Sequence, residues 1–129
     1  MTATHPDGEL RPLYEVKADL FRGLAHPLRI RILEILSAAD EVPVGTLLVE
    51  TRLEASHLSQ QLAVLRRHRL VLSERRASQV FYRLAYPQVA DLLRIARELL
   101  GQILVGSDDQ LRNAEALPPV GSAFPERDR

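Results

Sequence analysis

The sequence has 129 residues, of which 46% are hydrophobic and 26% charged, the composition of one folded domain. Its 17 basic residues balance its 17 acidic ones, so the overall charge indicates no partner. The absence of cysteine excludes disulfides, thiolate metal sites and a cysteine nucleophile. No apolar run reaches the roughly eighteen residues that predict a membrane helix, and the first residues lack the pattern of a secretory signal. We therefore expect a cytoplasmic protein with no membrane partner.

Two helices are predicted in the first third of the chain. Residues 1–9 are polar and are expected to form a flexible N-terminus. Apolar residues then recur at helical spacing from Leu13 to Leu24, which predicts a first helix. Pro27 suits the first turn of a second helix, because its missing N–H would be unpaired there in any case. The wide apolar surface of this second helix predicts a buried, central position, until residues 40–43 end it.

A short helix, a tight turn and a longer helix follow. The short helix covers about Val44 to Thr51, residues 52–54 make the turn, and the longer helix runs from about Ala55 to His68. Three leucines of the longer helix recur at spacings of four and three and define its apolar face. Its other face carries polar and basic side chains: Ser56, His57, Ser59, Gln60, Gln61, Arg66 and Arg67.

The periodicity changes after the longer helix. Residues 70–74 and 80–84 are short β-prone runs around the polar link 75–79, a pattern that predicts a hairpin. The last regular element spans about Pro87 to Val105 and has a nearly continuous apolar stripe at helical spacing. Residues 106–129 show no period and are expected to be a disordered tail.

The balanced total charge hides a basic middle third. Residues 44–86 carry seven arginines against three glutamates, and five of these arginines lie between Arg66 and Arg76. A charge run alone is most simply a solvated surface, but a localised basic cluster also marks proteins that bind nucleic acid. The elements around the cluster decide between these interpretations.

The order of these elements predicts a winged helix-turn-helix, mainly α with a small β-hairpin wing, of about five helices and two to three strands. A longer helix with a small polar face can enter a DNA major groove, and the short helix before it supports that position. Glutamine can bond an adenine edge at two points, and arginines at a hairpin tip can reach phosphates. We therefore predict that the partner is double-stranded DNA.

Four runs of residues resemble the ArsR/SmtB-type transcriptional repressors over about residues 13–105. The runs are LAHPLRIRIL (24–33), VGTL (44–47), SHLSQQLAVLR (56–66) and VFYRL (80–84). The resemblance implies a homodimer that binds operator DNA and releases it when an effector binds. It also implies that bases are faced by Ser56, His57, Ser59, Gln60 and Gln61, and that the wing presents Arg75, Arg76 and Ser78.

The sequence departs from this family at three positions. The family usually has histidine where Gln61 stands, and glycine near Arg69 and Ala77. Because alanine is strained at a positive φ, we expect the turn of the wing to differ in shape.

A metal effector is not predicted. The resemblance implies a possible site across the last helix, where Asp91 matches the first ligand but Leu93, Leu104 and Ser107 occupy the other three places. One carboxylate cannot hold zinc or nickel, so we predict no metal and no cofactor and leave the effector open.

The four histidines offer one alternative metal site. His26 is interpreted as a helix-start residue, His57 as part of the DNA face and His68 as a solvated helix-end cation. His5, with a carboxylate of residue 7 or 9 and a partner subunit, remains as a novel metal site.

The apolar stripe of the last helix predicts a dimer, because one small domain cannot cover it. A two-fold dimer places two reading helices about 34–36 Å apart, which predicts an inverted-repeat operator. In the alternative interpretation, the first helix covers this stripe within one chain. The predicted interface comprises Leu13, Leu20, Leu92, Leu93, Ala96, Leu99, Leu100 and Ile103.

Residues 10–105 are thus predicted to form a winged helix-turn-helix domain with terminal dimerisation helices, acting as a homodimeric repressor. An enzyme is not predicted, because the sequence has no glycine-rich phosphate loop and no histidine beside a plausible Ser–Asp pair. The remaining alternative is a winged helix that contacts another protein and does not bind specific DNA.

Overall fold

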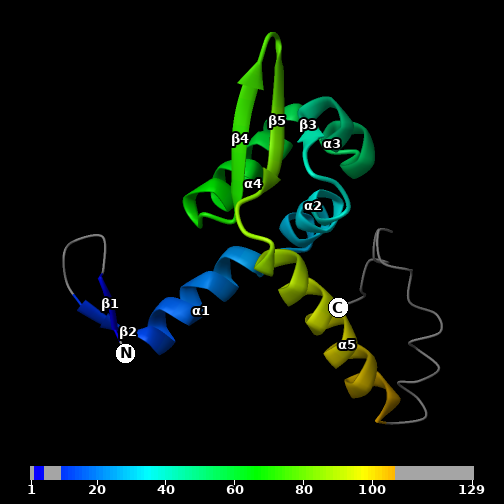
Figure 1. The fold of residues 1–129 in the computed structure, drawn as a ribbon. Coiled ribbons are helices and arrows are strands. Elements are labelled where there is room, and N and C mark those ends of the chain that lie inside the picture. Colours follow the sequence, from blue (N-terminus) through cyan, green and yellow to red (C-terminus); the bar gives the residue numbers. More distant parts are fainter. Residues whose placement is uncertain (1, 5–9, 107–129) are drawn as a thin grey trace.

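The protein is described by a computed structural model, which covers residues 2–4 and 10–106. Its body holds three helices, α2 (Pro27–Ser37), α3 (Val44–Thr51) and α4 (Ala55–Arg67), together with a three-stranded sheet. Two further helices, α1 (Leu13–Leu24) and α5 (Gln88–Val105), extend from this body in diverging directions (Figure 1). The predicted fold class, five helices with a small β-hairpin wing, is confirmed for the described part of the chain.

Local sequence signals set the helix ends. His26 caps α2, since its Nδ1 accepts a hydrogen bond of 3.0 Å from the N–H of Leu28, and Pro27 occupies the first turn as predicted. α3 ends at Thr51, and its C-cap Arg52 adopts a left-handed conformation with φ 58°. α4 stops one residue before the predicted end, with His68 as its C-cap.

The sheet consists of β3 (Val42–Pro43), β5 (Gln79–Leu84) and β4 (Val71–Arg76), in that order and antiparallel. The hairpin strands are longer than predicted, because the backbones at positions 75 and 76 pair with those at positions 80 and 79. Only Ala77 and Ser78 form the turn. Ala77 has φ 55°, so the turn uses the left-handed conformation that favours glycine, despite the alanine Cβ.

The core lies between the helices of the body and the sheet. Ile32, Leu33 and Leu36 of α2 are its centre, as the predicted central helix requires. Val89, in the first turn of α5, is the last buried residue of the described chain. No helix within residues 10–106 is long and apolar enough to cross a membrane.

The N-terminal region contains a strand pair that the sequence pattern did not predict. β1 (Thr2–Thr4) pairs antiparallel with β2 (Leu10–Pro12), directly before α1. Three residues are too few for a diagnostic period, so the sequence does not reveal the strand at Thr2–Thr4, and the flexible N-terminus stays a prediction. Residues 5–9 and the predicted tail from residue 107 onward lie outside the described residues.

Candidate nucleic-acid interface

A tight turn joins α3 to α4. The hydroxyl of Thr51 donates to the Leu47 carbonyl at 2.6 Å and accepts from the N–H of Leu53 at 3.4 Å. The N–H of Arg52 donates to the Leu48 carbonyl at 3.0 Å, which satisfies an end carbonyl of α3. These bonds hold the start of α4 in a defined position relative to α3.

One face of α4 is buried and the opposite face is exposed. The buried face presents Leu58, Leu62 and Leu65 to the core. A helix turns 100° per residue, so side chains on the side opposite these leucines point outward. The exposed predicted DNA-binding residues of α4 are Ser56, Ser59, Gln60, Arg66 and Arg67, whereas His57 is half-buried.

Gln61 lies on the packed face of α4, not on the exposed one. Its exposed fraction is 8%, and its side-chain oxygen accepts a 3.0 Å hydrogen bond from Arg29 Nη1. The prediction that Gln61 faces bases is therefore wrong for this structure. Gln61 is three residues after Leu58 and four before Leu65, so helical spacing alone places it near the core.

The two wing arginines differ in their contacts. Arg76 pairs with Glu41, in the loop before β3, and its guanidinium lies 4.0 Å above the ring centre of Phe81. The hydrogen bond to Glu41 raises the pKa of Arg76 above its already high ordinary value. Among the described residues no carboxylate pairs with Arg75, so this guanidinium is available to an anionic partner.

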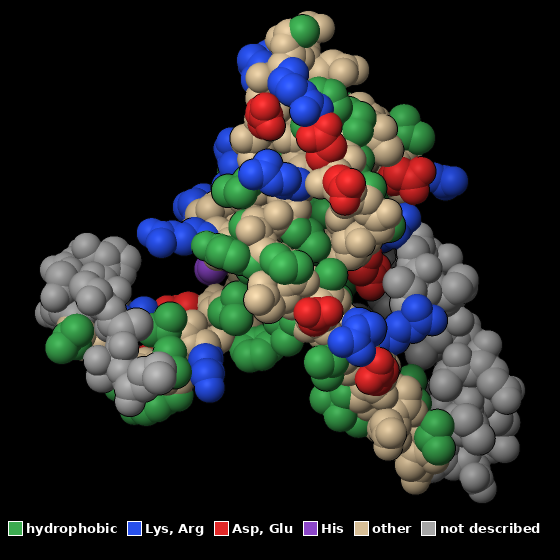
Figure 2. All heavy atoms as spheres, in the orientation of Figure 1, with side chains coloured by type: hydrophobic (Ala, Val, Ile, Leu, Met, Phe, Trp, Pro, Cys, Tyr) green, Lys and Arg blue, Asp and Glu red, His purple; other side chains and the backbone are tan. Residues whose placement is uncertain are grey.

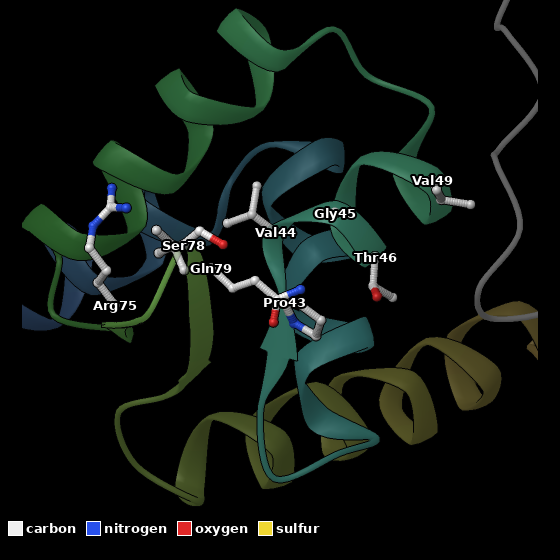
Figure 3. Close-up of a pocket in the computed structure, with 9 residues that line it drawn as sticks. Pro43, Val44, Gly45, Thr46, Val49, Arg75, Ser78 and Gln79 are labelled. Atoms are coloured by element: carbon white, nitrogen blue, oxygen red, sulfur yellow. The ribbon is translucent and has the colours of Figure 1, made fainter.

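A shallow cleft lies between the wing and the start of α3 (Figure 3). Arg75 and Ser78 line it from the wing, and Gly45 and Thr46 line it from the first turn of α3. Figure 2 shows basic side chains on the wing and down the flank below it. The wing and α4 thus both carry exposed basic and polar side chains.

The described residues contain no group of three or more histidine and carboxylate side chains that could hold a metal ion. Asp91, the one matching ligand position of the last helix, is exposed and lies 3.8 Å from Arg94 Nη2. His5 and its neighbouring carboxylates lie outside the described residues, so that alternative stays a prediction.

Both outer helices carry exposed apolar side chains. Figure 1 shows α1 and α5 leaving the body on different sides, so α1 does not cover the stripe of α5. The alternative of an intramolecular cover is therefore wrong. Of the predicted interface residues, Leu92 and Leu93 pack partly on the core and Leu13 is half-buried, whereas the exposed ones are Leu20, Ala96, Leu99, Leu100 and Ile103.

Comparison with known proteins shows similar chains in bacteria. The HTH-type transcriptional regulator Rv0081 of Mycobacterium tuberculosis is 46% identical over 116 residues, which are 89% of this chain and 98% of the relative. Its crystal structure matches with a TM-score of 0.68 over 74% of this chain and 95% of that one. The biofilm growth-associated repressor of Agrobacterium fabrum is 42% identical over 59% of this chain and 64% of its own.

A solved structure from Mycobacterium bovis is the homodimeric winged helix-turn-helix DNA-binding domain of a possible ArsR-family transcriptional regulator. It matches with 25% identity and a TM-score of 0.66, over 74% of this chain and 88% of that one. No family model matches the chain.

The fold and the exposed face of α4 define a winged helix-turn-helix protein of the DNA-binding, transcription-regulating class. None of the relatives named above is described as an enzyme. The chain belongs to the ArsR/SmtB family of transcriptional regulators.

Sequence reasoning missed two residues that organise this surface. Arg29 lies in the family-like run 24–33, but only its distance in space to α4 reveals the contact with Gln61. Glu41 is 35 residues from Arg76, so no local pattern predicts their pairing. Helical spacing was the one available signal, and it applied to Gln61 alone.

Proposed function

We propose that the protein is a homodimeric repressor that binds an inverted-repeat operator, with α4 in the major groove and the wing on the adjacent backbone. The observation that carries this proposal is the division of α4 into a buried leucine face and an exposed face of serine, glutamine and arginine. A repressor of this kind acts by occupying DNA, so the proposal includes no catalytic step and no cofactor. Residues 10–105 form its working domain, and it acts in the cytoplasm, where bacterial DNA is found.

Each part of the surface has its own task in this proposal. Gln60, Ser56 and Ser59 contact base edges, where short hydroxyl side chains allow close approach of the helix. Arg66, Arg67 and Arg75 contact phosphates, which fixes position and affinity but carries no sequence information. A DNA sugar-phosphate backbone that passes between α3 and the wing would contact Arg75 together with the first turn of α3.

The homodimer is proposed from the exposed apolar faces of α1 and α5. Leu99 is 58% exposed and Ile103 54% exposed in the single chain, although both lie on one apolar stripe. A stripe of this size marks an interface. The homodimeric relative from Mycobacterium bovis supports the same assembly.

Removing the glutamine amide that reads the base is the direct test of sequence readout. Gln60→Ala is expected to cost about 1–3 kcal/mol on the best operator and to relax the preference at one base position. The measurement is selection of duplexes from a random pool by both proteins, followed by titration of the selected duplex. Equal affinity and equal preference in the two proteins would contradict the proposed docking.

Removing the free wing cation tests the phosphate contact. Arg75→Ala is expected to weaken all duplexes alike and to lower the slope of log K against log salt by about 0.9. Arg94→Ala is the matched control, because Arg94 pairs with Asp91 and Glu98 on α5. If both variants change the salt slope equally, the wing has no specific place on the DNA. A protein that binds no duplex at all would favour the protein-contact alternative.

A further inference from the structure

Arg29 connects the end of α1 to the middle of α4. Its Nε donates to the carbonyl of Gly23 at 2.8 Å, and its Nη2 donates to the carbonyl of Arg22 at 3.2 Å. Its Nη1 donates to the side-chain oxygen of Gln61 at 3.0 Å. One planar group on α2 therefore spans two other helices.

The chemistry of these three bonds suits a rigid link. The last carbonyls of a helix have no partner within the helix, and the C-terminal end attracts cations. A guanidinium has donors in a fixed plane, so its two bonds to α1 fix the direction of the third. Gln61 is buried on the α4 side, where an unsatisfied amide would be costly.

A second contact holds α1 against the same face of α4. A Cβ added to Gly23 would lie 2.7 Å from Cγ of His68, so the imidazole packs directly on the α1 backbone. His68 follows Gln61 by seven residues, which places both on one side of the helix. Gln61 Nε2 also lies 3.4 Å from Nε2 of His57, one turn nearer to the start of α4.

We propose that Arg29 and Gln61 are positioning residues that fix the orientation of α4 relative to α1. The inference rests on the proposed function, because it gives these residues a part in operator reading without contact with DNA. α1 carries part of the proposed dimer interface. The link therefore makes the orientation of the exposed face of α4 depend on how the two subunits are arranged. A small displacement of the end of α1 is then passed to the half-buried His57 through Gln61.

The test uses the full chain, a duplex selected by the parent protein from a random pool, and a scrambled duplex of equal length. Arg29→Met and Gln61→Leu remove one end of the link each, and the double variant removes both. Arg31→Met is the matched control, because Arg31 lies on the same helix but approaches Glu50 of α3 at 3.7 Å. Gln61→Glu keeps an oxygen acceptor for Arg29 and serves as the conservative rescue.

We expect both single variants to keep the dimer and the affinity for scrambled DNA within about threefold, and to lose about tenfold or more on the selected duplex. The double variant should lose no more than the larger single loss, because the two changes remove the same link. Arg31→Met and Gln61→Glu should retain most of the discrimination, which is the ratio of the affinity for the selected duplex to that for the scrambled duplex.

Additive losses, unchanged discrimination in folded variants, or an equal loss in Arg31→Met would each overturn the inference. If Gln61→Leu does not fold, the other three variants test the inference. It is overturned if Arg29→Met keeps its discrimination, or if Arg31→Met or Gln61→Glu loses as much as Arg29→Met. A parent protein that enriches no duplex contradicts the proposed function itself, a result distinct from all of these.

Discussion

Single arginines in this chain serve three different purposes. Arg29 satisfies helix-end carbonyls and a buried amide, Arg76 pairs with a carboxylate and an aromatic ring, and Arg75 has no carboxylate partner in the described residues. Charge counting treats all three alike. Their separate tasks depend on neighbours that lie 32 residues from Arg29 and 35 from Arg76.

His26 gives the first stability prediction. Its burial lowers the pKa of the imidazole below 6.5, and the charges of Arg29 and His57 lower it further. Only the unprotonated Nδ1 can accept the hydrogen bond from Leu28 N–H that caps α2. Below pH 6.5 the imidazole of His26 is therefore protonated to a greater extent in the unfolded chain than in the folded one. The contribution of His26 is complete above that pH and is lost as the pH falls through the lower folded value.

The measurement is the urea midpoint of unfolding across the acidic range, for the parent and for His26→Asn. Asparagine keeps an acceptor at the N-cap and does not titrate. The urea midpoint of the variant should therefore fall less steeply than that of the parent as the pH is lowered below 6.5. The lowered pKa of Asp19, caused mainly by its hydrogen bond with Arg11, acts below 3.8 and does not interfere. Parallel curves for the two proteins would show that the cap does not titrate.

At the element scale, long periodic segments are predictable and short pairings are not. α1 and α3 have the predicted bounds, because each shows helical spacing between clear start and stop residues. β1 and β3 have three and two residues, which is too short for a period. The polar run 75–79 predicts a link, and only the backbone register shows that positions 75, 76 and 79 belong to the paired strands.

The same reasoning separates the site residues. The exposed face of α4 follows from the spacing of its leucines, and the same spacing places Gln61 on the packed face although its side chain is polar. Its partner Arg29 supplies the hydrogen bond that makes this burial affordable. A pattern of residue types reports polarity, but it does not report which polar groups satisfy one another.

Two alanine-to-glycine substitutions, one in the wing turn and one in a helix, are expected to change stability in opposite directions. Ala77→Gly removes a Cβ at φ 55° and is expected to stabilise the protein by about 0.5–1 kcal/mol, the left-handed penalty less the entropy of glycine. Ala18→Gly, in exposed α1, should destabilise it by about 1 kcal/mol. Thermal unfolding of both variants measures the two effects. Destabilisation by both would show that the turn carries no strain.

At the scale of the whole molecule, α1 and α5 leave the body with apolar side chains that no part of the described chain covers. The core itself ends at the first turn of α5, where Val89 is buried. Leu24 of α1 and Leu92 and Leu93 of α5 still contact the core, but the outer parts of both helices do not. These outer parts add apolar surface that a second chain of the proposed homodimer would bury.

Leu99→Glu tests this assembly. Because Leu99 is exposed in the single chain, the new carboxylate should leave the fold of the single chain intact. Burial of this unpaired charge between two chains would be costly, so the dimer should not form. The variant is expected to be monomeric and to lose operator binding. Gly101→Glu is the control, since it adds the same charge at a position where a new Cβ meets nothing within 4 Å.

Light scattering at micromolar concentration, with a melting curve for each variant, separates the outcomes. A folded Leu99→Glu dimer, or a parent protein that is monomeric at this concentration, would contradict the apolar interface. Loss of the dimer in both variants would indicate a general charge effect on α5.

The uncovered faces of α1 and α5 also determine how the proposed repressor responds to its own abundance. While most chains are single, the concentration of paired chains rises with the square of the total, so a twofold change in expression alters the binding species by about fourfold. In the proposed repressor, gene dosage and protein turnover would therefore change operator occupancy even without a bound effector. A promoter controlled in this way responds more steeply than in proportion to the number of copies in the cell.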